Sequence, residues 1–188
     1  MVINFKSTLS ILMLVILIGC FGDQKEPSTV SISGQTMGTT YNVTVVDNPL
    51  SLSKEDLKKR IEETLNDVNE KMSNWYEQSE ITTINNDKRG KPIDLSQELF
   101  DVINISTDIH NRSNGAFDIT AAPLINLWGF GPNKSERKIP SVLEVKAALE
   151  LVGQTKLLKL TPGLNQLKKR NPEVSINLSA IAKGYGID

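Results

Sequence analysis

Residues 115–131 read Gly115-Ala116-Phe117-Asp118-Ile119-Thr120-Ala121-Ala122-Pro123-Leu124-Ile125-Asn126-Leu127-Trp128-Gly129-Phe130-Gly131, which fits neither an ordinary helix nor an ordinary strand. Gly115 follows directly on a helical pattern, so it is expected to let the backbone turn with a positive φ angle. Asp118 beside Phe117 suits a turn that aims a carboxylate at a ligand under an aromatic ring. The alternative is a loop between helices whose phenylalanine and tryptophan belong to the core.

Three helices are predicted ahead of this stretch, with Ser53, Ser79 and Ser96 as their N-caps. In two of them the apolar residues recur at helical spacing and predict a face that packs on the core. These faces consist of Leu57, Ile61, Leu65, Val68 and Met72 in the first helix and of Leu99, Val102, Ile103, Ser106 and Ile109 in the third.

Trp75 and Tyr76 follow the end of the first helix. Two adjacent aromatic side chains cannot both face the core easily, so one of them is expected to be exposed as a stacking surface. His110 is the only histidine. It has no second histidine with which to form a metal pair, and it is interpreted as structural or exposed.

Strands are predicted at 30–33, 41–45, 156–160 and 174–178. Together with the helices they indicate an α+β fold, in which helices pack on a mostly antiparallel sheet. Met37 lies between the first two strands with a glycine on either side. This connection is either a plain hairpin turn or a turn that presents Met37 to a ligand.

Two further segments carry predictions of their own. A helix capped by Ser141 is expected to end at Gly153 and to turn its apolar face inward. Lys168-Lys169-Arg170, the longest basic run, is interpreted as a solvated loop. The residues of the helix expected to face inward are Val142, Val145, Leu149 and Val152.

The composition excludes several function classes. The chain has 188 residues and a net charge of −1, and it carries no basic stripe that would suit a nucleic acid. The sequence contains no GxGxxG, GxxxxGK[ST], HExxH, CxxC-pair or GxSxG pattern.

The N-terminus resembles a bacterial lipoprotein signal. Lys6 precedes an apolar run at 11–18, which is shorter than the ~20 residues of a spanning helix. Leu17-Ile18-Gly19-Cys20 then matches a lipoprotein cleavage box. We expect a signal peptide at 1–19, lipidation at Cys20, a tether at 20–28 and a folded domain at 29–188. The alternative is a conventional signal peptide with an incidental cysteine.

The segment 177–188 is expected to pass from a strand through a cap into a helix rich in small residues. A helix N-terminus with free amides suits an anion such as a diphosphate, and Lys183 would add a positive charge there. Because the sequence stops inside this expected helix, a truncated chain is also expected.

Four segments, taken in order, resemble the ApbE family of FAD:protein FMN transferases. They are Thr36-Met37-Gly38-Thr39-Thr40-Tyr41; Met72-Ser73-Asn74-Trp75 with Ser79-Glu80-Ile81; the 115–131 stretch; and Asn177-Leu178-Ser179-Ala180-Ile181-Ala182-Lys183-Gly184-Tyr185. The resemblance implies a tunnelling-fold-like domain. It also implies Mg²⁺-dependent transfer of FMN from FAD to a threonine hydroxyl of a partner protein, with release of AMP.

The same resemblance implies the partners, the location and the site residues. The acceptors would be subunits of membrane redox complexes of the Nqr and Rnf type, and the protein would be lipid-anchored at the periplasmic face of the cell envelope. The backbone carbonyl of Ala180 would help to hold Mg²⁺. The FAD-binding positions would be Met37, Trp75, Ala116, Phe117, Asp118, Asn177 and Lys183.

The sequence departs from the family pattern in two ways. Position 177 is commonly Asp in the family, and Asn177 keeps the shape and an acceptor but loses the charge. The family's C-terminal half, with the residues that complete the metal site and the catalytic apparatus, does not follow. The chain is therefore expected to be an inactive fragment. Two other functions stay open, a non-enzymatic FAD-binding lipoprotein and an FAD pyrophosphatase that releases FMN and AMP.

Overall fold

The computed structural model describes residues 27–48, 50–132 and 139–188. The predicted signal peptide, Cys20 and most of the predicted tether lie outside the described residues. The described chain is an α+β protein, as the sequence predicts, with one two-stranded and one three-stranded antiparallel sheet. None of the helices in these ranges has the length and apolar character needed to cross a membrane.

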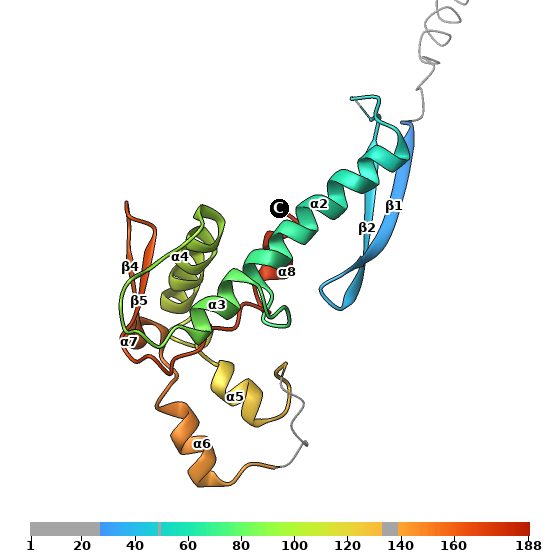
Figure 1. Cartoon of the computed structure of the whole chain (residues 1–188). Coiled ribbons are helices and arrows are strands. Elements are labelled where there is room, and N and C mark those ends of the chain that lie inside the picture. Colours follow the sequence, from blue (N-terminus) through green and yellow to red (C-terminus); the bar gives the residue numbers. More distant parts are fainter. Residues whose placement is uncertain (1–26, 49, 133–138) are drawn as a thin grey trace, which may run out of the picture.

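A long hairpin and a long helix lie side by side at one end of the molecule (Figure 1). The strands β1 (Thr29–Thr36) and β2 (Thr39–Val46) confirm the first two predicted strands. They are joined at Met37 and Gly38, which both have positive φ, 50° and 69°. Two such residues suit the tight turn whose twist matches that of a hairpin.

The helix α2 (Lys54–Met72) begins where the sequence predicts, because the Ser53 side chain accepts a hydrogen bond from the Asp56 amide at 3.0 Å. Its predicted apolar stripe is only partly buried. Val68 and Met72 belong to the core, whereas the earlier residues of the stripe, Leu57, Ile61 and Leu65, are half-buried. The first half of α2 packs on the hairpin and not on the main core.

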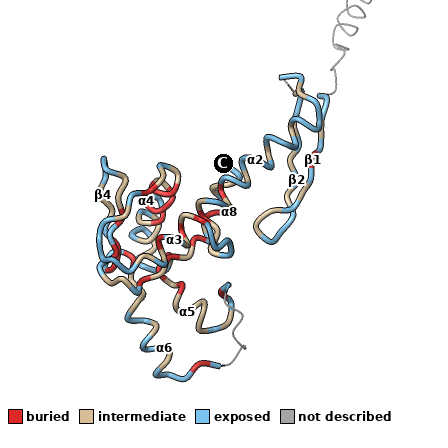
Figure 2. The backbone as a smooth tube through the Cα atoms, in the orientation of Figure 1, coloured by how far each residue is buried: buried red, intermediate tan, exposed pale blue. Residues whose placement is uncertain are grey.

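The main core surrounds α3 (Glu80–Asn86) and α4 (Gln97–Arg112), where Figure 2 shows most of the buried backbone. Ser79 and Ser96 cap these helices, as predicted. Gly115 has a φ of 83° and ends the α4 region, also as predicted. The residues of the core that are fully buried include Ile81, Leu99, Ile103, Leu167, Val174, Ile176 and Leu178.

The second sheet corrects three predictions. Its strands are β3 (Ile93–Asp94), β4 (Leu158–Thr161) and β5 (Gln166–Lys169), in the order β3-β5-β4. The predicted strand at 156–160 begins later, because residues 154–157 form the helical turn α7 (Gln154–Leu157). The predicted loop at 168–170 contains the end of β5. Residues 174–178 are extended but pair with no strand among the described residues.

Two helices lie at the opposite end of the molecule from the hairpin, α5 (Ala122–Leu127) and α6 (Val142–Leu149) (Figure 1). Ser141 caps α6, as predicted, and Val145 and Val152 are half-buried, but the prediction that Val142 and Leu149 face inward is wrong. Val142 is 70% exposed and Leu149 is 48% exposed. The reason is that α6 packs mainly on α5, and in the described part of the chain it stands away from the main core.

Lys169 is the clearest departure from the sequence prediction. Its side chain is 3% exposed, and its Nζ donates to the carbonyl oxygens of Ile84 at 2.9 Å and Asn85 at 3.2 Å. Burial, with a contribution from the nearby Lys88 charge, lowers the pKa of Lys169 from 10.5 to about 8. Through these hydrogen bonds, Lys169 connects β5 to the C-terminal end of α3.

This burial predicts a pH-dependent stability. Between about pH 8 and pH 10.5 the unfolded lysine keeps its proton while the folded lysine has released it, so the free energy of unfolding rises with pH in this window. Relative to Lys169→Met, we expect a gain of about 1–3 kcal/mol across the window, measured by urea unfolding. Lys168→Met, on the exposed side of the same strand, is the control. Parallel pH profiles for the wild type and Lys169→Met would contradict the prediction.

Candidate functional site

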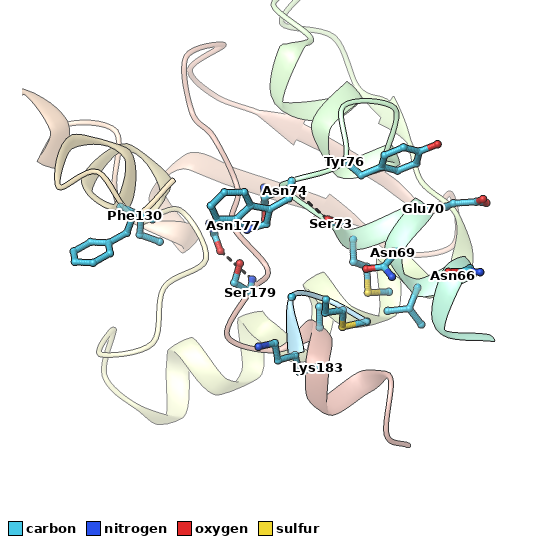
Figure 3. Close-up of a pocket in the computed structure, with 17 residues that line it drawn as sticks. Asn66, Asn69, Glu70, Ser73, Asn74, Tyr76, Phe130, Asn177, Ser179 and Lys183 are labelled. Atoms are coloured by element: carbon cyan, nitrogen blue, oxygen red, sulfur yellow. Dashed lines mark hydrogen bonds between the residues drawn. The ribbon is translucent and has the colours of Figure 1, made fainter. Parts of the chain in front are cut away.

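A cavity of about 1030 Å³ opens between α2, the end of α5 and the last segment of the described chain. Figure 3 shows Phe130 on one side and Asn66, Asn69 and Glu70 on the other. A volume of this size is at the upper end of the range for small-molecule sites. The cavity is lined by Met37, Gly38, Asn66, Val68, Asn69, Glu70, Met72, Ser73, Asn74, Trp75, Tyr76, Ile125, Phe130, Asn177, Ser179, Ala182 and Lys183.

The aromatic wall of the cavity is the connection at 73–76. The helix α2 stops there because Ser73 is extended, and the Ser73 carbonyl accepts a hydrogen bond from Ser79 Oγ at 2.6 Å. The following backbone then carries Trp75 and Tyr76 outward, 64% and 43% exposed. The sequence predicts one exposed aromatic side chain here, and the structure exposes both. Flat apolar faces that stay in solvent suit a planar ring as their partner.

The polar wall is the extended segment that leads into α8 (Ala182–Tyr185). Val174, Ile176 and Leu178 are fully buried. Because side chains alternate along an extended chain, Asn177 faces the other way and lines the cavity. Asn177 Oδ1 accepts a hydrogen bond from the Ser179 amide at 2.9 Å (Figure 3), which turns the chain toward α8.

The charge of the cavity comes from two side chains. Lys183 is the one cationic residue among its described lining residues, and Glu70 is the one carboxylate. The helix α8 has only four residues and no side-chain cap, so its dipole is weak. Attraction of a diphosphate to this wall would therefore depend on Lys183 more than on the helix N-terminus that the sequence suggests.

Met37 reaches the cavity from the hairpin turn, as one of the two sequence interpretations proposes. It is half-buried and packs against the core. A second cavity, of about 640 Å³, lies between the hairpin, α2 and the last residues of the chain. Met37 and Lys183 line both cavities, so they mark the place where the two meet.

Residues 116–118 lie outside the described lining of both cavities. Asp118 points inward. Its Oδ1 accepts from the amide of Thr120 at 2.7 Å and from the hydroxyl of the same residue, and its Oδ2 accepts from the Gln154 amide at 2.9 Å. His110 Nδ1 is 3.5 Å from Oδ2 and donates to the Phe117 carbonyl at 2.8 Å, so the histidine is structural. Contact of these three residues with a ligand remains a prediction.

The aromatic residues of the 115–131 stretch differ in their burial. Phe117 is half-buried and packs against the core. Trp128 and Phe130 are 43% and 61% exposed, and Phe130 lines the cavity. The loop interpretation is therefore confirmed for Phe117 only.

The described residues do not by themselves fit a magnesium site. They contain no group of three or more His, Cys, Asp or Glu side chains that could hold a metal. Ala180 is exposed beside the polar wall, and its carbonyl could supply one ligand. Mg²⁺ needs several oxygen ligands in near-octahedral geometry, so one carbonyl would require partners that these residues do not provide.

The sequence prediction missed the polar side chains of α2. Asn66, Asn69, Glu70 and Ser73 are spaced by three and four positions and form a stripe next to the apolar one. Asparagine is a poor helix former, so two of them in the last two turns of α2 were an available signal. The amides of Asn74 and Asn85 were also missed: Asn74 stands in the motif Met72-Ser73-Asn74-Trp75 but received no role, and Asn85 is in none of the quoted motifs.

Comparison with known proteins gives consistent matches. The model of the ApbE family matches residues 37–188. The chain is similar to the FAD:protein FMN transferases of Vibrio cholerae, with 35% identity over 93% of this chain and 51% of that one, and of Haemophilus influenzae, with 38% identity over 88% and 49%. It thus spans about half the length of these curated relatives.

Solved structures agree with the sequence matches. The flavin transferase ApbE from Vibrio cholerae superimposes with a TM-score of 0.81 at 34% identity, over 86% of this chain and 52% of that one. The apo form of the Pseudomonas stutzeri flavinyl transferase ApbE superimposes with a TM-score of 0.80 at 29% identity, over 89% and 55%.

Proposed function

The chain belongs to the ApbE family, and from this premise we propose that the protein is an FAD:protein FMN transferase whose flavin-binding cavity lies in this chain. One observation carries the proposal. Four of the positions that the family resemblance assigns to FAD come from three separate segments of the chain and line one cavity. These are Met37, Trp75, Asn177 and Lys183.

We assign the parts of the cavity by their chemistry. The exposed rings of Trp75 and Tyr76 would stack on the isoalloxazine. Lys183 would neutralise charge on the diphosphate, and the Asn177 amide would offer a hydrogen bond. We also propose that residues 116–118 belong to the FAD site, as the family resemblance implies. Asp118 would contribute by fixing the loop conformation through its hydrogen bonds to Thr120 and Gln154.

The proposed reaction is a phosphoryl-type transfer. The threonine hydroxyl of the acceptor attacks the phosphorus of the FMN half, a threonine–phosphate bond forms, and the bond to the AMP phosphate breaks. AMP leaves, and the hydroxyl proton passes to a base that the described residues do not identify. In such reactions the protein mainly positions the groups and stabilises charge. A Mg²⁺ requirement, with the Ala180 carbonyl as one ligand, belongs to the proposal and depends on further ligands.

The test has a binding step and a transfer step. FAD is titrated into the purified 188-residue chain, with and without EDTA, while tryptophan and flavin fluorescence are recorded. We expect saturable quenching that EDTA does not change, because the described cavity has no metal site. Absence of FAD binding would overturn the proposal.

The transfer step uses the purified protein with FAD, Mg²⁺ and a threonine-bearing acceptor domain, followed by mass spectrometry of the acceptor. A flavin-mass adduct on the acceptor supports the transferase. FMN and AMP without an adduct would indicate an FAD pyrophosphatase, and binding without turnover would indicate an FAD-binding protein. The proposed acceptors are subunits of Nqr- and Rnf-type membrane redox complexes.

We further propose that Cys20 is lipidated and anchors the protein at the periplasmic face of the cell envelope. In cells fed labelled palmitate, the wild type is expected to be labelled and to sediment with membranes. Cys20→Ser is expected to lose both properties, because acyl chains provide the anchor. A wild type that stays unlabelled and soluble would contradict the anchor.

A further inference from the structure

The extended segment 174–178 lies in the core without a partner strand among the described residues, yet its backbone is hydrogen-bonded. Two asparagine side chains take the place of a strand. Asn85 Oδ1 accepts from the Ile176 amide at 2.7 Å, and Asn85 Nδ2 donates to the Ile176 carbonyl at 2.9 Å. A carboxamide has a donor and an acceptor side by side, so it pairs with one residue as a neighbouring strand would.

The Asn74 side chain also forms two hydrogen bonds with the backbone of this segment. Its Nδ2 donates to the Ile176 carbonyl at 2.7 Å, and its Oδ1 accepts from the Leu178 amide at 3.0 Å. The Asn177 amide between these contacts donates to the Ile119 carbonyl at 2.7 Å. The amides of residues 176–178 are thus all satisfied, which a buried extended chain requires.

The two asparagines differ in their relation to the cavity. Asn74 lines it (Figure 3) and precedes Trp75 directly. Through its hydrogen bonds to Ile176 and Leu178, the Asn74 side chain links the aromatic wall to the polar wall. Asn85 is not among the described lining residues and lies behind the segment, at the end of α3. Its own carbonyl is held by the buried Lys169. Side chains locked in this way fix the direction of Asn177 and the start of the 179–183 turn.

We propose that Asn74 and Asn85 are positioning residues of the flavin cavity, which keep the Asn177 wall at the distance from the Trp75 wall that the ligand needs. The inference rests on the proposed function, because it takes FAD as the ligand. Asn85 gives the clearer test of positioning, since it does not line the cavity and would affect the ligand only through the backbone of Ile176.

Asn85→Asp is the decisive variant, and Asn86→Asp is its matched control. The aspartate keeps the acceptor for the Ile176 amide but loses the donor and turns an oxygen toward the Ile176 carbonyl. Asn86 is the next residue of α3 and is exposed. We expect Asn85→Asp to weaken FAD binding at least about 10-fold and to reduce the quenching of tryptophan fluorescence at saturation. Asn86→Asp is expected to bind as the wild type does.

The measurement is made at a temperature where urea unfolding shows every variant to be almost fully folded. A purely structural role lowers the free energy of unfolding but leaves affinity and quenching unchanged there, because the fraction of competent protein is still near one. If Asn85→Asp does not fold, Asn85→Ser is used, which removes the pairing without adding charge.

The outcomes separate the two proposals. A wild type that fails to bind FAD overturns the proposed function. A wild type that binds FAD, with Asn85 variants that bind equally well and quench equally, overturns the positioning role and leaves the function intact.

The double variant Asn74→Ala, Asn85→Ala is expected to lose less binding free energy for FAD than the sum of the losses in the two single variants, since both amides donate to the Ile176 carbonyl.

Discussion

Asp118→Asn is expected to lower the free energy of unfolding by about 3 kcal/mol. The Asp118 carboxylate is nearly buried and accepts hydrogen bonds on both oxygens, from Thr120 and from the Gln154 amide. An asparagine amide in the same place would turn its NH₂ group toward N–H or O–H donors, whichever way the side chain rotates. Urea unfolding followed by circular dichroism measures the loss.

The control is Asp108→Asn on α4, the helix that precedes the Asp118 loop. Asp108 is 63% exposed and pairs with Arg112, so its loss is expected to change the free energy of unfolding by less than about 0.5 kcal/mol. FAD affinity is measured for both variants in the folded range. If Asp118→Asn keeps its stability and loses FAD affinity, the carboxylate meets the ligand directly and the internal network is not its main role.

Trp75→Ala is expected to weaken FAD binding about 10- to 100-fold, the largest effect on affinity that we predict. Stacking of a flat ring on an exposed aromatic side chain contributes about 1–3 kcal/mol. Because the Trp75 side chain is 64% exposed, its removal is expected to cost little folding stability. Trp75→Phe should retain much of the affinity, since it keeps a flat face.

Trp128→Ala provides the control, because the chain has only two tryptophans and both are partly exposed. Trp128 lies at the end of α5 and is not among the described lining residues of the cavity. Fluorescence titration of both variants decides the question. An equal loss of FAD affinity in Trp75→Ala and Trp128→Ala would contradict the proposal that Trp75 stacks on the flavin.

The sequence predicted the parts of the fold that depend on near neighbours. The caps at Ser53, Ser79, Ser96 and Ser141 were found, and the structure confirms each through hydrogen bonds within three residues. The hairpin and its turn at Met37 were found for the same reason. The family motifs also pointed to Met37, Trp75, Asn177 and Lys183, which the structure brings to one cavity.

Other outcomes needed partners that are remote in the chain. The solvated-loop interpretation of Lys169 was wrong because its carbonyl partners lie 84 and 85 positions earlier. Residues 174–178 have the alternation of a strand, but asparagine side chains up to 104 positions away hold them instead. The prediction that Val142 and Leu149 of α6 face inward was wrong, because an apolar stripe shows that a helix can be buried but not that a neighbouring element covers it.

The sequence by itself therefore determined the helix caps and the N-terminal hairpin, since these follow from hydrogen bonds and periodicities within one or two turns of chain. Through the family motifs it also determined the family and four of the residues that line the cavity. Only the tertiary structure decided that Asp118 faces inward, that Lys169 is buried and that Asn74 and Asn85 replace a strand. Each of these depends on donors and acceptors that folding brings together from distant positions, and such pairings leave no trace in the spacing of neighbouring residues.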